Sequence, residues 1–268
     1  MSGVLNKQLL RKVPEVTVYF WIIKLLTTAL GESTSDYLVY HFNPYLVVIA
    51  GFIGFIAILA LQLSTRRYIP WVYWLTVVMV AIFGTMAADV THVALGVPYA
   101  ISTIVFAIAL SVIFKLWHKT EDTLSIHSIT TTRRELFYWA TVSATFALGT
   151  AAGDLLAYTA RLGFLSAGIV FVAIFAVPAI GYWLFRFNAI FAFWFAYIIT
   201  RPIGASFADW TGKAKNVGGL GWGDGPVAAA LTLLIIIFVG YLQITHVDVD
   251  TIADSCPLNV SASANQID

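Results

Sequence analysis

The stretch WIIKLLTTALGESTSD at residues 21–36 carries the pattern that decides the fold. A Trp is followed by a Gly ten residues later and by an Asp five residues after that. The same spacing recurs in the segments 74–89, 139–154 and 194–209. Four copies at one spacing indicate internal repetition, which has to be recognised before any fold is assigned. The repeated residues are Trp21, Gly31 and Asp36, then Trp74, Gly84 and Asp89, then Trp139, Gly149 and Asp154, and finally Trp194, Gly204 and Asp209.

The composition is typical of a membrane protein. Hydrophobic residues make up 60% of the chain and charged residues only 11%, whereas about a quarter of the residues in a soluble domain are charged. The net charge of +1 says nothing about partners, and the lack of a basic run argues against a nucleic-acid partner. Cys256 is the only cysteine, which excludes an intrachain disulfide and a thiolate metal cluster. The chain is therefore a polytopic protein of the lipid bilayer.

Hydropathy predicts an all-α fold with eight transmembrane helices, because about 20 apolar residues cross the bilayer. Each repeat then contains two helices, with the Trp–Gly–Asp pattern on the first. The predicted helices cover 15–40, 44–64, 69–94, 98–117, 135–160, 163–185, 188–208 and 226–245. The predicted parts are an N-terminus (1–14), a membrane domain (15–245) with repeats at 15–64, 69–117, 135–185 and 188–245, and a disordered tail (246–268).

The basic residues predict the orientation. Loops and termini on one side carry ten Lys and Arg residues, while the other side carries Arg161, Lys213 and Lys215. Lys and Arg accumulate on the cytoplasmic side of membrane proteins. We therefore expect both termini in the cytoplasm. All four Trp–Gly–Asp helices would run outward, so the repeats would be parallel to one another.

Other features of the repeats predict packing. The Gly of each copy falls near mid-membrane, where a missing side chain lets helices approach closely. The Trp residues are expected to anchor or pack the helix ends. Pro202 is expected to kink or break its helix. The glycine-rich segment 210–225 is either a mobile lid or a plain connector.

Ionisable side chains inside the predicted helices point to function, because charges in lipid must face the bundle interior and pair. Four helices with inward carboxylates would build one polar centre. The residue after each Gly lies four residues before the Asp and so shares its helix face. The resulting candidate cation or metal ligands are Glu32, Asp36, Asp89, Asp154 and Asp209, with Thr85 and Thr150 as neutral oxygens and Lys24 and Arg201 as counter-charges.

Oxygen ligands of this kind suit hard ions such as Mg²⁺, Mn²⁺, Ca²⁺ or Na⁺, and protons. The sequence has none of the common hydrolase, zinc-protease or nucleotide-binding motifs. The seventh predicted helix contains no lysine, so nothing in it suggests a retinal site. We therefore expect a protein that is not an enzyme and that carries no cofactor.

The fourfold pattern resembles a family of bacterial membrane proteins defined by four tandem repeats of unknown function. The similarity covers residues 15–245. The family's recognised mark is the repeated tryptophan, here Trp21, Trp74, Trp139 and Trp194. The resemblance implies two spans per repeat and a bacterial inner (cytoplasmic) membrane. It implies no substrate or reaction.

The residues favour a secondary transporter that exports a small cation, with Mn²⁺ ahead of Na⁺, in exchange for protons. A second possible cargo is an amphipathic organic cation, bound through carboxylates and the tryptophans. Against it, Trp and Asp of one helix lie about 22 Å apart along the axis. Two further hypotheses are a non-transporting structural or sensory protein and an intramembrane enzyme acting on a lipid-like substrate. A homo-oligomer is also compatible with the sequence.

Overall fold

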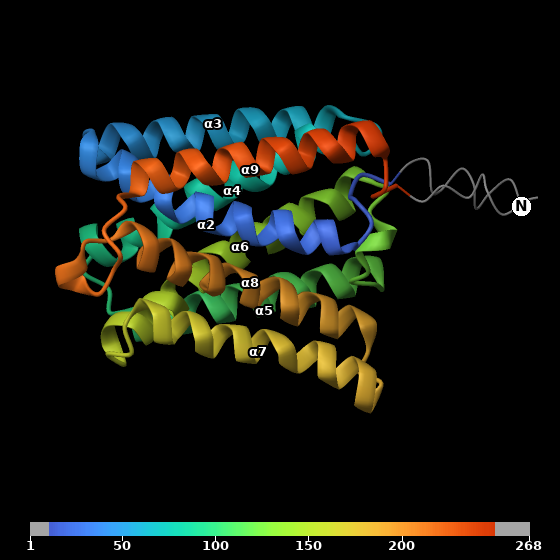
Figure 1. The fold of residues 1–268 in the computed structure, drawn as a ribbon. Coiled ribbons are helices and arrows are strands. Elements are labelled where there is room, and N and C mark those ends of the chain that lie inside the picture. Colours follow the sequence, from blue (N-terminus) through green and yellow to red (C-terminus); the bar gives the residue numbers. More distant parts are fainter. Residues whose placement is uncertain (1–10, 250–268) are drawn as a thin grey trace, which may run out of the picture.

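The computed structural model describes residues 11–249, and every regular element in this part of the chain is a helix (Figure 1). The all-α prediction is thereby confirmed. Short 3-10 turns lie at Ile126–Ser128 (η2) and Lys215–Val217 (η4). The long helices are α2 (Val18–His41), α3 (Pro44–Ser64), α4 (Pro70–Asp89), α5 (Tyr99–Glu121), α6 (Thr132–Asp154), α7 (Phe164–Phe185), α8 (Ala189–Gly212) and α9 (Asp224–Thr245).

The sequence sets where these helices begin. The Thr17, Thr131 and Asn188 side chains accept hydrogen bonds from the first free N–H groups of α2, α6 and α8, as N-cap residues do. Pro44 and Pro70 lie in the first turns of α3 and α4, where their missing N–H is not needed. Pro202 lies inside α8, which continues unbroken to Gly212. The expected break is therefore absent, since packed membrane helices tolerate proline.

The four Trp–Gly–Asp helices form an inner ring. In sequence order α2, α4, α6 and α8 each pack on the next, and α8 packs back on α2. The second helix of each repeat packs outside, against the first helix of the following repeat: α3 on α4, α5 on α6, α7 on α8, and α9 on α2. The chain is therefore closed on itself as a fourfold arrangement of parallel repeats.

The repeated glycines make this ring tight. The position of a Cβ added at Gly31, Gly84 or Gly149 would lie 2.5–2.8 Å from a side chain of the next ring helix, and one at Gly204 would overlap Thr28. The expected helix–helix contact at every motif glycine is confirmed. Each glycine faces the residue three positions before the next repeat's glycine, giving the pairs Gly31–Ala81, Gly84–Phe146, Gly149–Arg201 and Gly204–Thr28.

The tryptophans close one end of the ring. Trp74, Trp139 and Trp194 are buried and Trp21 is partly buried, so they pack in the core. The aromatic residue before each Trp contacts the Trp of the next repeat, with ring centroids 5.5–6.1 Å apart. We call these eight residues the aromatic layer; its cross-repeat pairs are Phe20–Trp74, Tyr73–Trp139, Tyr138–Trp194 and Phe193–Trp21.

Both ends of the described chain lie at one end of the bundle (Figure 1). The aromatic layer lies at this end, because its residues fall near the starts of the ring helices. There the Glu15 N–H donates to the Asp248 carbonyl (2.9 Å), and Asp248 is 2% exposed. The disorder expected from residue 246 is therefore absent at 246–249; the remainder of that tail, 250–268, lies outside the described residues. We call this the terminal end, and the opposite end, which holds segment 213–223, the loop end.

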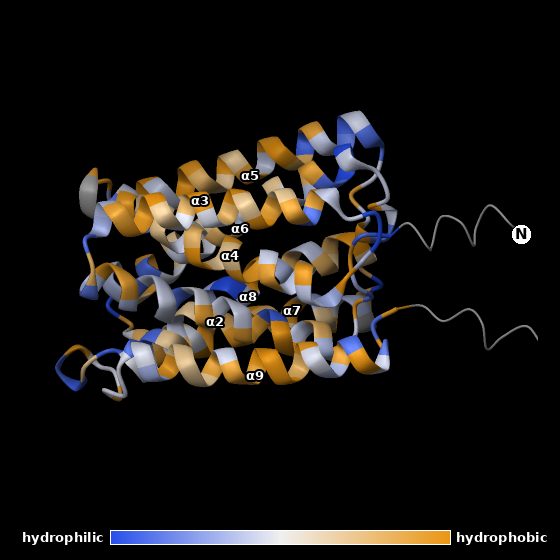
Figure 2. Cartoon of the chain, turned by 90° about the horizontal axis from the view of Figure 1, so that it is seen from above, coloured by the Kyte–Doolittle hydropathy of each residue, from blue (hydrophilic) through white to orange (hydrophobic). Residues whose placement is uncertain are grey.

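Among the described residues, seven helices are long and apolar enough to cross a membrane. Their apolar windows are 50–61% buried in α4, α6 and α8 but 11–33% buried in α3, α5, α7 and α9. The outer helices therefore present the apolar surface, as Figure 2 shows for α3, α5 and α9. Of the eight predicted spans, only α2 is not among these seven; it has 24 residues and carries Lys24, Glu32 and Asp36.

Candidate cation-binding site

The inner ring encloses a column of polar side chains. Lys24, Thr28, Glu32 and Asp36 follow one another at intervals of four along α2. The first three are buried and Asp36 is partly buried. Because residues four apart share a helix face, α2 supplies one continuous polar stripe to the interior.

Arg201 connects the repeats at mid-column. Its side chain is fully buried. Its Nη2 donates to Glu32 Oε2 (2.6 Å), to Thr150 Oγ1 (2.8 Å) and to Thr85 Oγ1. These three acceptors are the residues that follow the motif glycine in repeats one, two and three. Repeat four therefore supplies a positively charged side chain, Arg201, that binds the residue after the motif glycine in every other repeat.

Thr85 and Thr150 were expected to offer neutral oxygens to a cation. In the structure their hydroxyls donate to the Ala81 and Phe146 carbonyls of their own helices and accept from Arg201. Their oxygen atoms are thus directed at the guanidinium. In this arrangement they hold Arg201 in place rather than line an open site.

Lys24 does not pair with a carboxylate among the described residues, although a counter-charge role was expected. Its ammonium lies 4.0 Å from the centre of the Phe146 ring and 4.1 Å from that of Tyr197. No described hydrogen-bond acceptor reaches Nζ. The reason is position: Lys24 lies two helical turns below Glu32, on the side of the aromatic layer, where the neighbouring side chains are rings rather than acids. Contact with ring faces partly compensates its burial.

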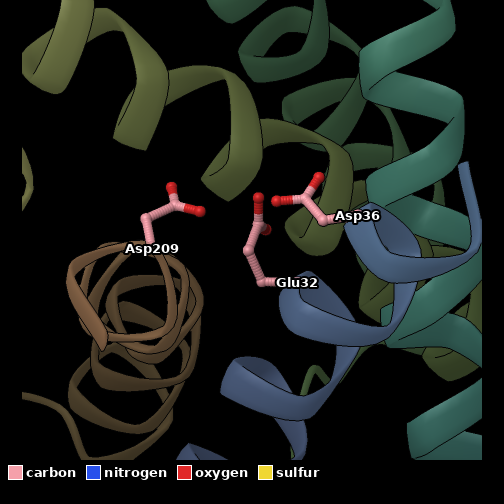
Figure 3. Close-up of side chains that lie close together, drawn as sticks. All are labelled: Glu32, Asp36 and Asp209. Carbon is pink, nitrogen blue, oxygen red and sulfur yellow. The ribbon is translucent and has the colours of Figure 1, made fainter. Parts of the chain in front are cut away.

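Three carboxylates meet toward the loop end. Glu32, Asp36 and Asp209 each place an oxygen within 4.8 Å of the others, in an arrangement that could hold a metal ion. In Figure 3, Glu32 lies between Asp36 on the same helix and Asp209 on α8, and the three groups point toward one another. Asp209 is 5% exposed and its Oδ1 has no hydrogen-bond donor among the described residues. We call these residues the carboxylate trio.

A lysine, Lys213, contacts the carboxylate trio and was not predicted as part of the site. Its Nζ pairs with Asp36 Oδ2 and lies 3.9 Å from Asp209 Oδ1. Burial lowers the pKa of this ammonium, but Asp36 and Asp209 outweigh that effect and raise the pKa above its ordinary value. Lys213 is therefore charged at physiological pH. The available signal was its spacing of four from Asp209, which places both on one helix face.

Asp89 and Asp154 lie close enough to Glu32 and to each other to interact electrostatically. Each is the last residue of its α-helix, and a π-helical turn follows directly, η1 (Val90–Ala94) and η3 (Leu155–Thr159). Within the described residues neither forms a hydrogen bond or an ion pair. All five predicted acids thus lie in one region, but only three belong to the trio.

The glycine-rich segment is folded rather than open. The N–H groups of Leu220, Gly221, Trp222 and Gly223 donate to the Trp210, Lys213, Thr211 and Gly212 carbonyls, at 2.6–3.1 Å. These bonds satisfy carbonyls that a helix C-terminus leaves free. The segment therefore holds the end of α8, and with it Lys213, over the trio.

This fold and interior define an α-helical membrane protein built from four tandem repeats. The family model described as "Repeat of Unknown Function (DUF347)" matches residues 19–68, 72–123, 137–187 and 192–247. The chain belongs to this DUF347 repeat family, and the matched segments agree with the four repeats deduced from the tryptophan spacing. Neither a curated protein nor a solved structure matches the chain.

Proposed function

We propose that this protein is a secondary transporter of the bacterial cytoplasmic membrane that exports a small cation in exchange for protons. The observation that carries the proposal is the carboxylate trio, whose oxygens lie within 4.8 Å of one another inside a helical bundle. Carboxylate oxygens at this spacing suit a hard divalent ion, and we favour Mn²⁺.

The balance of charge supports coupling to protons. The five predicted acids gather at this end, while Arg201 and Lys213 are the cations paired with them in the described residues. Full ionisation of these five acids would leave three negative charges in a region of low dielectric, which is unfavourable. Protons or a bound cation would relieve that repulsion. Both would compete for the same oxygens, which is the minimal requirement for exchange.

The closed terminal end supports alternating access. The aromatic layer and the fully buried Arg201 separate the trio from the terminal end. A cation crossing this structure along the axis would have to pass a guanidinium and packed rings. The arrangement therefore suits a carrier that changes conformation, and it does not suit an open channel.

The second cargo, an amphipathic organic cation, has weaker support. The four motif tryptophans lie in the aromatic layer at the end opposite the trio, so one ligand would not contact both these tryptophans and the trio. Tyrosines at the loop end could still offer ring faces, since Tyr99 and Tyr158 stack there with centroids 6.1 Å apart and both interact electrostatically with Asp154.

Transport by purified protein in liposomes tests the proposal. We expect a pH gradient to drive Mn²⁺ across the membrane and Asp36→Asn or Asp209→Asn to reduce the flux to the level of empty liposomes. Asp122→Asn is the matched control, because Asp122 is an exposed acid in a left-handed conformation after α5 that Asn tolerates. The panel includes Mg²⁺, Ca²⁺, Na⁺ and tetraphenylphosphonium. Movement of tetraphenylphosphonium alone, above its passive entry into empty liposomes, would favour an organic cargo, and no movement of any cation above that background would reject transport.

A further inference from the structure

Lys213 occupies the part of the trio that a bound cation would need. Its ammonium contacts Asp36 and lies 3.9 Å from Asp209, while Asp36 and Asp209 share the trio with Glu32. A metal ion bridging these carboxylates would be repelled by an ammonium at this distance. The cation and Lys213 therefore compete for Asp36.

The position of Lys213 in the chain allows its side chain to leave the trio without unfolding a transmembrane helix. It is the first residue beyond α8 and belongs to the glycine-rich segment. The exposed fraction of its side chain is 15%. The aliphatic stem and four rotatable bonds of a lysine give its head group a wide reach.

An acid outside the trio, Asp224, is close enough to Lys213 to pair with its ammonium after displacement. Asp224, the first residue of α9, interacts electrostatically with Lys213. Its Oδ1 lies against the α carbon of Gly212, where a Cβ would overlap it. Asp224 is thus next to Lys213 but is not part of the trio.

We propose that Lys213 is a tethered counter-cation that fills the cation site when it is empty and moves toward Asp224 when a cation binds. This inference rests on the proposed cation exchange. Its consequence is kinetic: with Lys213 on the trio, the site that has released its cation carries less net negative charge, so the carrier can return across the membrane with its protons. Lys213 would thereby allow net exchange of the cation for protons and not only the exchange of one cation for another.

Binding of MnCl₂ to the purified full-length protein, measured by calorimetry, tests the competition. We expect Lys213→Gln to raise the affinity about tenfold or more, within the usual range of coupling between sites. Lys215→Gln removes the same charge from an exposed position of the same segment and should leave the affinity unchanged. Asp224→Asn should lower the affinity in the presence of Lys213 and have little effect in the Lys213→Gln background, because the two residues act as one pair.

Flux in liposomes gives the second readout. Lys213→Gln should retain exchange of internal Mn²⁺ for external radioactive Mn²⁺ while net flux falls. Binding by wild type with no change of affinity in Lys213→Gln would overturn this inference and leave the proposed function intact. Binding of Mn²⁺ by Lys213→Gln but not by wild type would support the counter-cation. No binding of Mn²⁺ by either protein would overturn this inference and the choice of Mn²⁺, while the proposed exchange would still be decided by the liposome panel of cations.

Discussion

At the scale of single residues, Arg201 shows how a difference between the four repeats at one position creates a polar centre that joins their helices. The residue three positions before each motif glycine is Thr28, Ala81, Phe146 or Arg201, and in every repeat it faces the preceding repeat's glycine. Only the arginine has the length and the fixed array of donors needed to bind three helices at once. Glu32 in repeat one supplies the matching charge (2.6 Å). The ring is therefore fastened by residues that depart from the repeat pattern.

Removal of this arginine gives a residue-scale prediction. Arg201→Met leaves Glu32 buried without its partner, which costs about 3–5 kcal/mol when a buried ion pair is broken from one side. We expect a large fall in the melting temperature of the purified protein. The double variant Arg201→Met with Glu32→Gln should recover part of that loss, because no unpaired charge remains. Equal stability of Arg201→Met and wild type would show that the pair contributes little.

At the scale of helices, the glycine contacts explain why the ring helices pack in sequence order. Each motif glycine accepts a side chain of the following ring helix, and the Gly204–Thr28 contact closes the ring. Hydrogen bonds accompany this closure, since Thr28 Oγ1 donates to the Thr200 carbonyl (3.2 Å) and Arg201 Nη1 to the Thr28 carbonyl (3.4 Å). Close backbone approach increases van der Waals contact, which together with interhelical hydrogen bonds drives helix association in lipid.

Substitution of a glycine tests this packing. Gly149→Leu places a branched side chain where even a Cβ would lie 2.5 Å from Arg201 Cγ, and we expect loss of folded protein in fluorescence-detected size exclusion. Gly240→Leu is the control, because a Cβ at Gly240 of α9 has no neighbour within 4 Å. Similar yields of both variants would contradict close packing at Gly149.

The helices and their contacts show which features could be predicted from the sequence and which could not. Hydropathy and the Trp–Gly–Asp spacing are local signals, and they predicted the helices, the four repeats and the glycine contacts. The packing of each outer helix on the following repeat depends on tertiary closure, for which no single segment carries a signal. Lys213 was missed because its segment reads as a polar glycine-rich connector, and the roles of Thr85 and Thr150 depend on where Arg201 extends. The π-helical turns after Asp89 and Asp154 leave no residue pattern that distinguishes them from α-helix.

At the scale of the whole molecule, the two ends of the bundle differ in chemistry. Both described chain ends lie at the terminal end (Figure 1), with the aromatic layer beside them, and the carboxylates lie toward the loop end. The orientation of the molecule in the membrane therefore decides from which side a cation reaches the trio. Basic residues predict that the terminal end faces the cytoplasm, which would direct the trio outward.

Labelling with a membrane-impermeant maleimide tests this orientation. Native Cys256 is the only cysteine, and we expect it to react only after cells are permeabilised, because the chain after α9 would be cytoplasmic. In a Cys256→Ser background, Val217→Cys should react in intact cells, since Val217 is 55% exposed in the segment at the loop end. The Cys256→Ser protein alone gives the background. The opposite pattern would place the loop end in the cytoplasm, so that the trio in this conformation would bind its cation from inside, and the excess of Lys and Arg would no longer explain the topology.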